Sequence, residues 1–245
     1  MRLLHSIRGK CLRLLRALGY RAAARHFGVL FPLRLAPSSA IIGQLDAQRY
    51  ERAETLLVRK HIPPGVVVLE LGGSLGIVSS VILHRRPSRL VSYEAVPELA
   101  AIAREVVALN HPSADYLCVN KAVGPSGVSE TTFFWSPELS LAGSSEVSGA
   151  KGLVSLVVPS VDLSHVLAEH RIGEGAWLVA DIEGMEYELL QNQTSALRSF
   201  AGVIIECHTS EQGGRFWTRQ DAENMLADQG FRMIQRIGPV ICMVR

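Results

Sequence analysis

The sequence lacks the features of several large protein classes. Although 48% of its 245 residues are hydrophobic, no apolar run reaches the roughly 18 residues of a membrane-spanning helix. The four cysteines (Cys11, Cys118, Cys207 and Cys242) are widely separated and form no C-x-x-C pair. We therefore expect no disulfide framework and no zinc or other metal site, and the reducing cytoplasm is the compartment that fits best.

Acidic residues are absent from the first 45 positions, which carry eight Lys/Arg and no Asp or Glu. The remaining 17 Lys/Arg share residues 46–245 with all 23 acids, so this larger part has a net negative charge. A negative body suits a cationic cofactor and argues against nucleic acid as the main partner.

The basic N-terminal segment is amphipathic. Over residues 1–18 a helical period places Leu4, Ile7 and Leu14 on one face and Arg2 and Arg13 opposite. We expect residues 1–45 to be a basic helical extension that packs on the body, lies on an anionic membrane surface or is a cleaved presequence. Arginines interrupt every apolar stretch, which excludes a secretory signal.

Residues 46–245 alternate between strand and helix patterns. Apolar strands are expected over residues 66–70, 90–94, 116–120, 177–181 and 202–207, and helices over 46–61, 98–109, 162–171 and 218–229. The chain closes with a hairpin about Gly238-Pro239. These patterns predict an α/β fold with a doubly wound, mostly parallel sheet and an antiparallel C-terminal hairpin. Two β-rich segments flank a Ser/Gly-rich stretch, residues 136–152, which we expect to be a lid loop or a disordered segment.

The first of these strands runs into a glycine-rich turn, Glu70-Leu71-Gly72-Gly73-Ser74-Leu75-Gly76. A dinucleotide fold requires G-x-G-x-x-G, and Leu71 occupies the position of the first glycine. The alternative spacing, acid-x-Gly-x-x-x-Gly, is satisfied by Glu70, Gly72 and Gly76. A carboxylate at a strand end suits a ligand with an amino group and a sulfonium, so the turn favours S-adenosyl-L-methionine, with Gly73 allowing close backbone approach.

Polar residues end the other parallel strands, where ligands bind in such folds. Glu94 follows Gly76 by 18 residues, the position of a ribose-diol acceptor, and Asn120 is expected at the adenine edge. Asp181 is expected to favour the positive charge of the cofactor. His208 or Glu183 is the candidate general base, and His208 shares a strand face with Glu206.

The chain resembles the FkbM-type family of S-adenosylmethionine-dependent methyltransferases over roughly residues 62–235. The matching segments are the glycine turn, Tyr93-Glu94-Ala95-Val96-Pro97, Asn120-Lys121-Ala122-Val123-Gly124, Val161-Asp162-Leu163, Asp181-Ile182-Glu183-Gly184-Met185-Glu186 and Ile204-Ile205-Glu206-Cys207-His208. Two positions depart from the family pattern, with Ala180 in place of a lysine and Ala95 in place of a proline.

This resemblance implies a Rossmann-like class I methyltransferase sheet in residues 46–245. It also implies O-methylation of a hydroxyl on a sugar, polyketide or similar metabolite. Two rival interpretations remain open. A nicotinamide-dependent oxidoreductase conflicts with Leu71 and the absence of a second substrate domain. The other rival is a non-catalytic module of the same fold, docked to a membrane or partner through its basic N-terminus.

Overall fold

The computed structural model describes residues 22–135, 154–212 and 214–245. The amphipathic segment 1–18 and the expected lid 136–152 lie outside these residues. The strands are β1 (Ala23–His26), β2 (Val29–Pro32), β3 (Val67–Leu71), β4 (Arg89–Tyr93), β5 (Tyr116–Val119), β6 (Ala122–Val123), β7 (Glu130–Trp135), β8 (Val154–Val161), β9 (Ala176–Ala180), β10 (Phe200–Glu206), β11 (Ser210–Gln212), β12 (Arg215–Trp217), β13 (Arg232–Ile237) and β14 (Val240–Val244). The helices are the short 3₁₀ helix η1 (Leu33–Leu35), α2 (Ser39–Asp46), α3 (Arg52–His61), α4 (Ile77–His84), α5 (Pro97–Asn110), α6 (Leu163–His170), α7 (Glu186–Asn192), α8 (Thr194–Leu197) and α9 (Arg219–Asp228).

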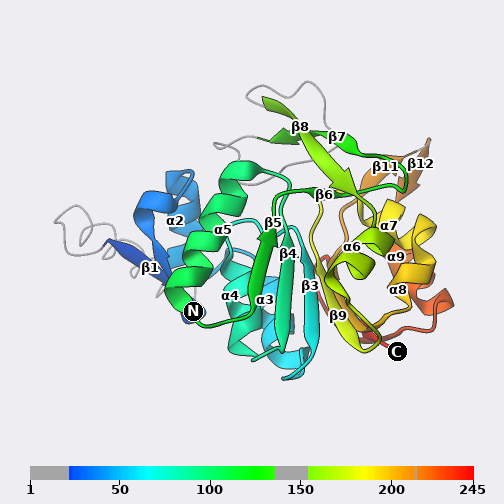
Figure 1. Ribbon diagram of the computed structural model, residues 1–245, viewed down its shortest axis with the longest axis horizontal. Coiled ribbons are helices and arrows are strands. Elements are labelled where there is room, and N and C mark those ends of the chain that lie inside the picture. Colours follow the sequence, from blue (N-terminus) through cyan, green and yellow to red (C-terminus); the bar gives the residue numbers. More distant parts are fainter. Residues whose placement is uncertain (1–21, 136–153, 213) are drawn as a thin grey trace.

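A seven-stranded sheet forms the centre of the fold, in the order β13-β14-β10-β9-β3-β4-β5 (Figure 1). The contiguous strands β10, β9, β3, β4 and β5 pair in parallel, and β14 and β13 add an antiparallel edge. The predicted doubly wound sheet with a C-terminal hairpin is therefore confirmed. The parallel strands point their carboxyl ends at one edge, where such sheets bind ligands.

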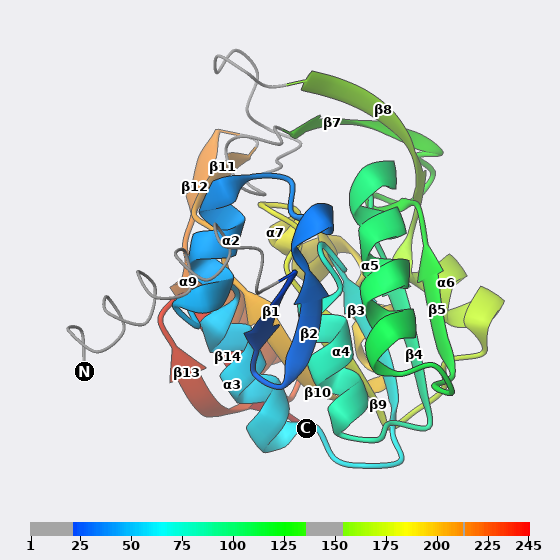
Figure 2. The same ribbon diagram turned by 90° about the vertical axis from the view of Figure 1, so that its left-hand side faces the viewer.

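Helices cover both faces of the sheet. α3, α4 and α5 lie on one face together with the β1–β2 hairpin and α2, and α6 to α9 lie on the other (Figures 1 and 2). The central strands are apolar on both sides because each face is covered, which explains the continuous runs such as Ala176–Ala180. Each layer supplies one of the two large clusters of buried side chains.

Residues 22–45 pack on the body, which is one of the expected alternatives, but they begin with a β-hairpin where a helical extension was expected. β1 and β2 form an antiparallel hairpin whose Val29 and Phe31 are completely buried against α4 and α5. Buried His26 joins the hairpin to the next segment, with its two ring nitrogens at 3.2 Å from the Leu45 carbonyl and 2.7 Å from the Tyr50 carbonyl.

The single helix expected over residues 46–61 is also wrong. α2 ends at Asp46 and α3 begins at Arg52, and the junction between them contains Gln48 and Glu51 in the left-handed region, at φ 55° and 41°. This junction turns the chain so that residues 49–54 face the carboxyl edge of the sheet.

A small second sheet, in the order β6-β8-β7, lies beyond the carboxyl edge of the central sheet (Figure 1). Its strands β7 and β8 match the two β-rich segments expected around the loop 136–152. In the described part of the chain no helix has both the length and the hydrophobicity needed to cross a bilayer.

Candidate active site

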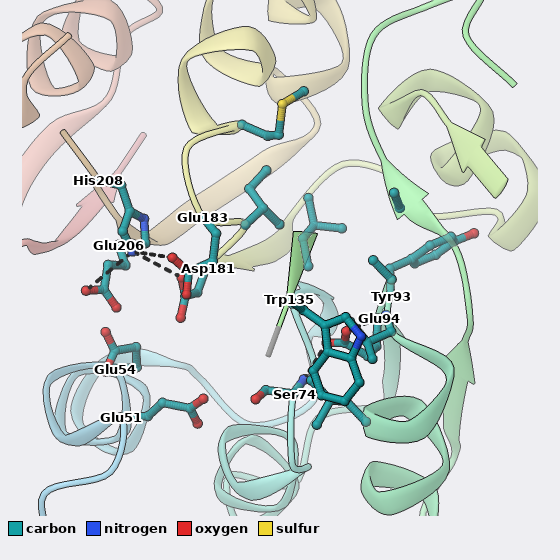
Figure 3. Close-up of a pocket in the computed structure, with 18 of the residues that line it drawn as sticks. Glu51, Glu54, Ser74, Tyr93, Glu94, Trp135, Asp181, Glu183, Glu206 and His208 are labelled. Carbon is teal, nitrogen blue, oxygen red and sulfur yellow. Dashed lines mark hydrogen bonds and ion pairs between the residues drawn. The ribbon is translucent and has the colours of Figure 1, made fainter. Parts of the chain in front are cut away.

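A cavity of about 640 Å³ opens at the carboxyl edge of the central sheet, within the range of roughly 300–1,000 Å³ typical of small-molecule sites. The turns after β3, β4, β9 and β10 form its floor. Residues 49–54 form one wall, and Thr131, Phe133 and Trp135 of β7 form another. Figure 3 shows a carboxylate-rich side around His208 and a second side around Glu94 and Trp135.

The glycine turn fits this floor because of Gly72. Its N–H and that of Gly73 both donate to the Tyr93 carbonyl, at 2.8 and 3.1 Å, which ties the turn to β4. Gly72 has φ +88°, and a Cβ there would overlap the carbonyl oxygen of Asp181. Only glycine lets the ends of β3 and β9 come this close, and Gly72 itself lines the cavity.

Glu94 is fixed at the second side of the cavity. Its carboxylate accepts hydrogen bonds from the Ser74 N–H at 2.7 Å and the Val96 N–H at 2.8 Å, and its side chain lines the cavity. Burial raises the pKa of Glu94 despite these N–H donors. Tyr50 reaches the same turn, with its hydroxyl 2.8 Å from Ser74 Oγ. The expected ribose acceptor therefore stands at the cavity, held by its neighbours.

Four residues expected to touch the cofactor do not line the cavity: Glu70, Gly73, Gly76 and Asn120. Glu70 is 1% exposed and accepts a hydrogen bond from Ser79 Oγ, because strand alternation turns it toward α4 while Leu71 lines the cavity. Burial raises the pKa of Glu70 to about 7.

Two of the other three residues, Gly76 and Asn120, hold neighbouring elements together. Gly76 begins α4 at φ +73°, and a Cβ there would lie 2.8 Å from the Ala103 Cα, so this glycine allows α4 to pack on α5. Asn120 donates its amide hydrogens to the Glu94 and Ala95 carbonyls at 2.8 and 2.9 Å. It holds the loop that carries Glu94 and does not line the cavity, and its expected contact with adenine stays a prediction.

The opposite side of the cavity brings together His208, Asp181, Glu183 and Glu206 (Figure 3). His208 Nε2 lies 3.3 Å from Glu183 Oε2, 3.8 Å from Asp181 Oδ1 and 3.9 Å from Glu206 Oε1. These side chains lie close together because β9 and β10 are neighbouring parallel strands, and β9 ends just before Asp181 while β10 ends at Glu206.

Glu186, an acid in the first turn of α7, orients this group. It is fully buried, and its two oxygens accept the Ile182 N–H at 3.1 Å and the Gly184 N–H at 2.9 Å. His208 Nδ1 lies 3.1 Å from Glu186 Oε1. The spacing of acids in the segment 181–186 is therefore explained by a tight turn, with Glu183 at φ +53°, and by the orientation of the imidazole.

The electrostatics of this side follow from burial and crowding. Burial opposes a charge on His208, but the hydrogen bond to Glu186 and the nearby carboxylates raise its pKa to about 9. Burial raises the pKa of Glu183 to about 7, and burial with Glu206 nearby raises that of Glu54 to about 8. Burial, followed by repulsion from Glu183, also raises the pKa of Asp181. His208 is thus a cation at neutral pH in this arrangement, which argues against its expected role as the base.

Sequence reasoning missed the contribution of Glu51 and Glu54. Both lie on the α2–α3 segment, and in Figure 3 they face Asp181 and Glu206 across the cavity. No local motif marks them. Their place depends on the left-handed turn at Glu51, which the single expected helix concealed.

Of the two residues that depart from the family pattern, Ala180 lies away from the cavity and Ala95 lines it. Ala180 is 1% exposed and belongs to the buried cluster under α6 to α9, so its methyl group does not face the cavity. Ala95 lines the cavity beside Glu94.

Comparison with known proteins gives the family. Residues 72–233 match the model of the methyltransferase FkbM domain. The chain belongs to this family. Methyl transfer is accordingly its activity, and the resemblance expected from sequence is confirmed. Among curated proteins, no match is found.

Solved structures share the fold at a distance. A protein of the NADB-Rossmann superfamily from Streptococcus agalactiae is 10% identical, with 78% of this chain and 67% of that chain covered and a TM-score of 0.45. Ribosomal protein L11 methylase from Lactobacillus delbrueckii subsp. bulgaricus is 15% identical, with 80% and 77% covered and a TM-score of 0.44. Magnesium protoporphyrin IX methyltransferase from Synechocystis PCC 6803 with bound SAM is 12% identical, with 78% and 76% covered and a TM-score of 0.44. These likenesses are too distant to carry an argument about substrate.

Proposed function

We propose that the protein transfers a methyl group from S-adenosyl-L-methionine to a hydroxyl of a small molecule such as a sugar or polyketide. The observation that carries the proposal is the two-sided cavity of an FkbM-family chain. Glu94 stands beside the Gly72 turn on one side, and a carboxylate cluster stands on the other. The donor fits the first side and the acceptor the second.

The donor side offers the interactions that S-adenosylmethionine requires. Glu94 lines the cavity, and the acceptor capacity that the N–H groups of Ser74, Ala95 and Val96 leave on its carboxylate is available to the ribose diol. Gly72 lines the cavity where the methionine portion would lie, and Asp181 stands next to it, between the donor side and the acceptor side. Phe133 and Trp135 add aromatic surface to the wall of the cavity.

Methyl transfer forms an O–CH₃ bond as the CH₃–S bond breaks, leaving S-adenosylhomocysteine. Holding the acceptor oxygen about 3 Å from the methyl carbon, in line with the sulfur, supplies most of the rate. The hydroxyl proton needs a base, and we assign Glu183 because it lines the cavity and has a pKa near neutrality. The proton passes to this carboxylate. His208, held by Glu186, positions it.

The acceptor is proposed to be a small metabolite and not a nucleic acid. Six carboxylates line the cavity against three Lys/Arg side chains, which disfavours a phosphate backbone.

A cytoplasmic location is proposed because Cys118, Cys207 and Cys242 are free thiols. Contact of the basic residues 1–45 with an anionic membrane is also proposed, and vesicle co-sedimentation of the full chain and of a chain starting near Ala40 would test it.

The experiment supplies methyl-labelled S-adenosylmethionine and a panel of sugar and polyketide alcohols, with products identified by mass and by the position of the label. We expect a methyl ether from at least one alcohol. Glu183→Gln should lower kcat by about 10²–10⁴-fold and leave the affinity for S-adenosylhomocysteine unchanged. Glu188→Gln is the matched control, because Glu188 binds Asn192 on α7 away from the cavity.

Two results would contradict the proposal. Label found on nitrogen or carbon would exclude O-methylation. Retained binding of S-adenosylhomocysteine, with no transfer to any hydroxylated acceptor, would favour the non-catalytic module.

A further inference from the structure

The carboxylate-rich side of the cavity contains a set of metal-ligand atoms. One atom each from Asp181, Glu206 and His208 lies within 4.8 Å of the other two. Two ligand atoms about 2.1 Å from a shared ion are at most about 4.2 Å apart. Small side-chain rotations would therefore bring all three atoms to bonding distance of one ion.

The imidazole is held in the way that metal-binding histidines are held. His208 Nδ1 lies 3.1 Å from Glu186 Oε1, and buried Glu186 is itself fixed by two backbone N–H groups. A carboxylate on the outer ring nitrogen sets the tautomer and points the other nitrogen at the ion. Here that other nitrogen, Nε2, faces Asp181 and Glu206.

A second, separate observation concerns Asp181. Its Oδ1 atom is shielded from solvent and accepts no hydrogen bond within the described residues. A buried carboxylate oxygen without a donor is costly, and its nearest positive group is His208 Nε2 at 3.8 Å, beyond hydrogen-bond distance. A cation between these groups would satisfy it.

An ion in the cavity can reach these three side chains. The side chains of His208, Asp181 and Glu206 are 27%, 24% and 23% exposed, and all three line the cavity. Glu183 and Glu54 line it beside them, so one imidazole stands among four carboxylates. An ion bound here would take the place of the protons that the imidazole and the carboxyl groups hold in its absence, since these groups bind metal only when deprotonated.

We propose that Asp181, Glu206 and His208 bind a divalent first-row transition-metal ion such as Mn²⁺ or Zn²⁺. One nitrogen and two carboxylate ligands match these ions better than Mg²⁺ or Ca²⁺, which prefer oxygen ligands alone. The proposal revises the expectation of no metal. That expectation considered cysteine spacing, whereas these ligands come together only because β9 and β10 are neighbours.

The ion narrows the acceptor class, and this step rests on the proposed function. A hydroxyl oxygen bound to the ion would lose its proton more readily, and a neighbouring oxygen of the same molecule would occupy a second open position. The acceptor class is therefore a metabolite with two adjacent oxygen donors, such as a vicinal diol or an α-hydroxy acid.

The test is titration of the full, untagged, chelator-treated chain with Mn²⁺, followed by electron paramagnetic resonance and calorimetry, with Zn²⁺ and Mg²⁺ in parallel. We expect one saturable Mn²⁺ or Zn²⁺ site and weaker Mg²⁺ binding. His208→Ala and Glu206→Gln should each weaken it by about tenfold or more. His165→Ala is the matched control, because exposed His165 also pairs with a carboxylate, Asp162, outside the cavity.

Circular dichroism and S-adenosylhomocysteine titration of the same variants separate this inference from the proposed function. A folded chain that binds S-adenosylhomocysteine but shows no saturable metal uptake overturns the metal site alone. Equal uptake by wild type, His208→Ala and Glu206→Gln overturns it as well. Thermal stabilisation by alkylammonium ions without stabilisation by Mn²⁺ or Zn²⁺ would assign the cavity to an organic cation instead.

Discussion

Replacing Glu70 by glutamine should change how the stability of the protein depends on pH. Glu70 is 1% exposed between β3 and α4, and burial raises its pKa from 4.5 to about 7. Each unit of pKa shift corresponds to about 1.4 kcal/mol, so ionising this carboxyl in the folded state costs about 3 kcal/mol more than in the unfolded chain.

The sign follows from proton binding. Between about pH 4.5 and pH 7 the folded state keeps the Glu70 proton that the unfolded state releases, so the free energy of unfolding falls as pH rises through this window. The full stability from this group is present below the unfolded pKa and is lost above the folded pKa. Between pH 5 and pH 8 the loss is about 2.5 kcal/mol.

The assay is urea denaturation of wild type and Glu70→Gln at about pH 5, 6, 7 and 8, a series that spans the folded-state pKa of Glu70. Because glutamine does not titrate, the wild type should lose about 2.5 kcal/mol more than the variant across this range. Glu174→Gln, at an exposed loop position, should run parallel to wild type. If the unfolding free energies of Glu70→Gln and wild type changed with pH in parallel, the argument that Glu70 is buried would be refuted. Glu70 would then again be a candidate for contact with the cofactor.

Two further substitutions test how the fold forms the site. Gly72→Ala should cost roughly twice as much unfolding free energy as Gly65→Ala. Both glycines have positive φ, worth about 1–2 kcal/mol, but only the Cβ at position 72 meets a neighbour, the Asp181 carbonyl. If urea denaturation gave equal losses of unfolding free energy for Gly72→Ala and Gly65→Ala, the turns after β3 and β9 would have to lie farther apart than in this structure. Phe31→Ala should lower the unfolding free energy by about 3–5 kcal/mol in one cooperative transition. A loss near zero would mean that the hairpin is an extension and not core.

The central sheet was predictable because its strands carry strong local signals. Continuous apolar runs, glycine turns and helix stripes marked β3, β4, β9 and β10 and placed Glu94, Asp181 and His208 at one edge. Parallel strands end at a common edge of the sheet, so the predicted topology was enough to bring these residues together.

The N-terminal hairpin was not predictable in the same way. Its strands have four residues each, and the basic charge of the segment suggested a separate extension. The overlooked signal is Phe27-Gly28, both at positive φ, which forms a two-residue hairpin turn.

The roles of site residues failed where tertiary contacts decide them. Glu70 follows the motif spacing, yet strand alternation turns it away from the cavity. Glu186 looked like an ordinary helix-start acid, and its contact with His208 requires β10 to lie beside the turn after β9. Glu54 depends on the break between α2 and α3. None of these relations is local in sequence.

The most direct test of the account is calorimetric titration of the purified chain with S-adenosylhomocysteine and S-adenosylmethionine, with NAD as the comparison ligand and Glu94→Gln alongside. We predict micromolar binding of the first two and none of NAD. Loss of a charged acceptor for the ribose hydroxyls should weaken binding by about 10–100-fold in Glu94→Gln, at about 1.5–3 kcal/mol per charged hydrogen bond. Binding of NAD in preference, or no binding of either sulfur ligand by a folded chain, would contradict the account.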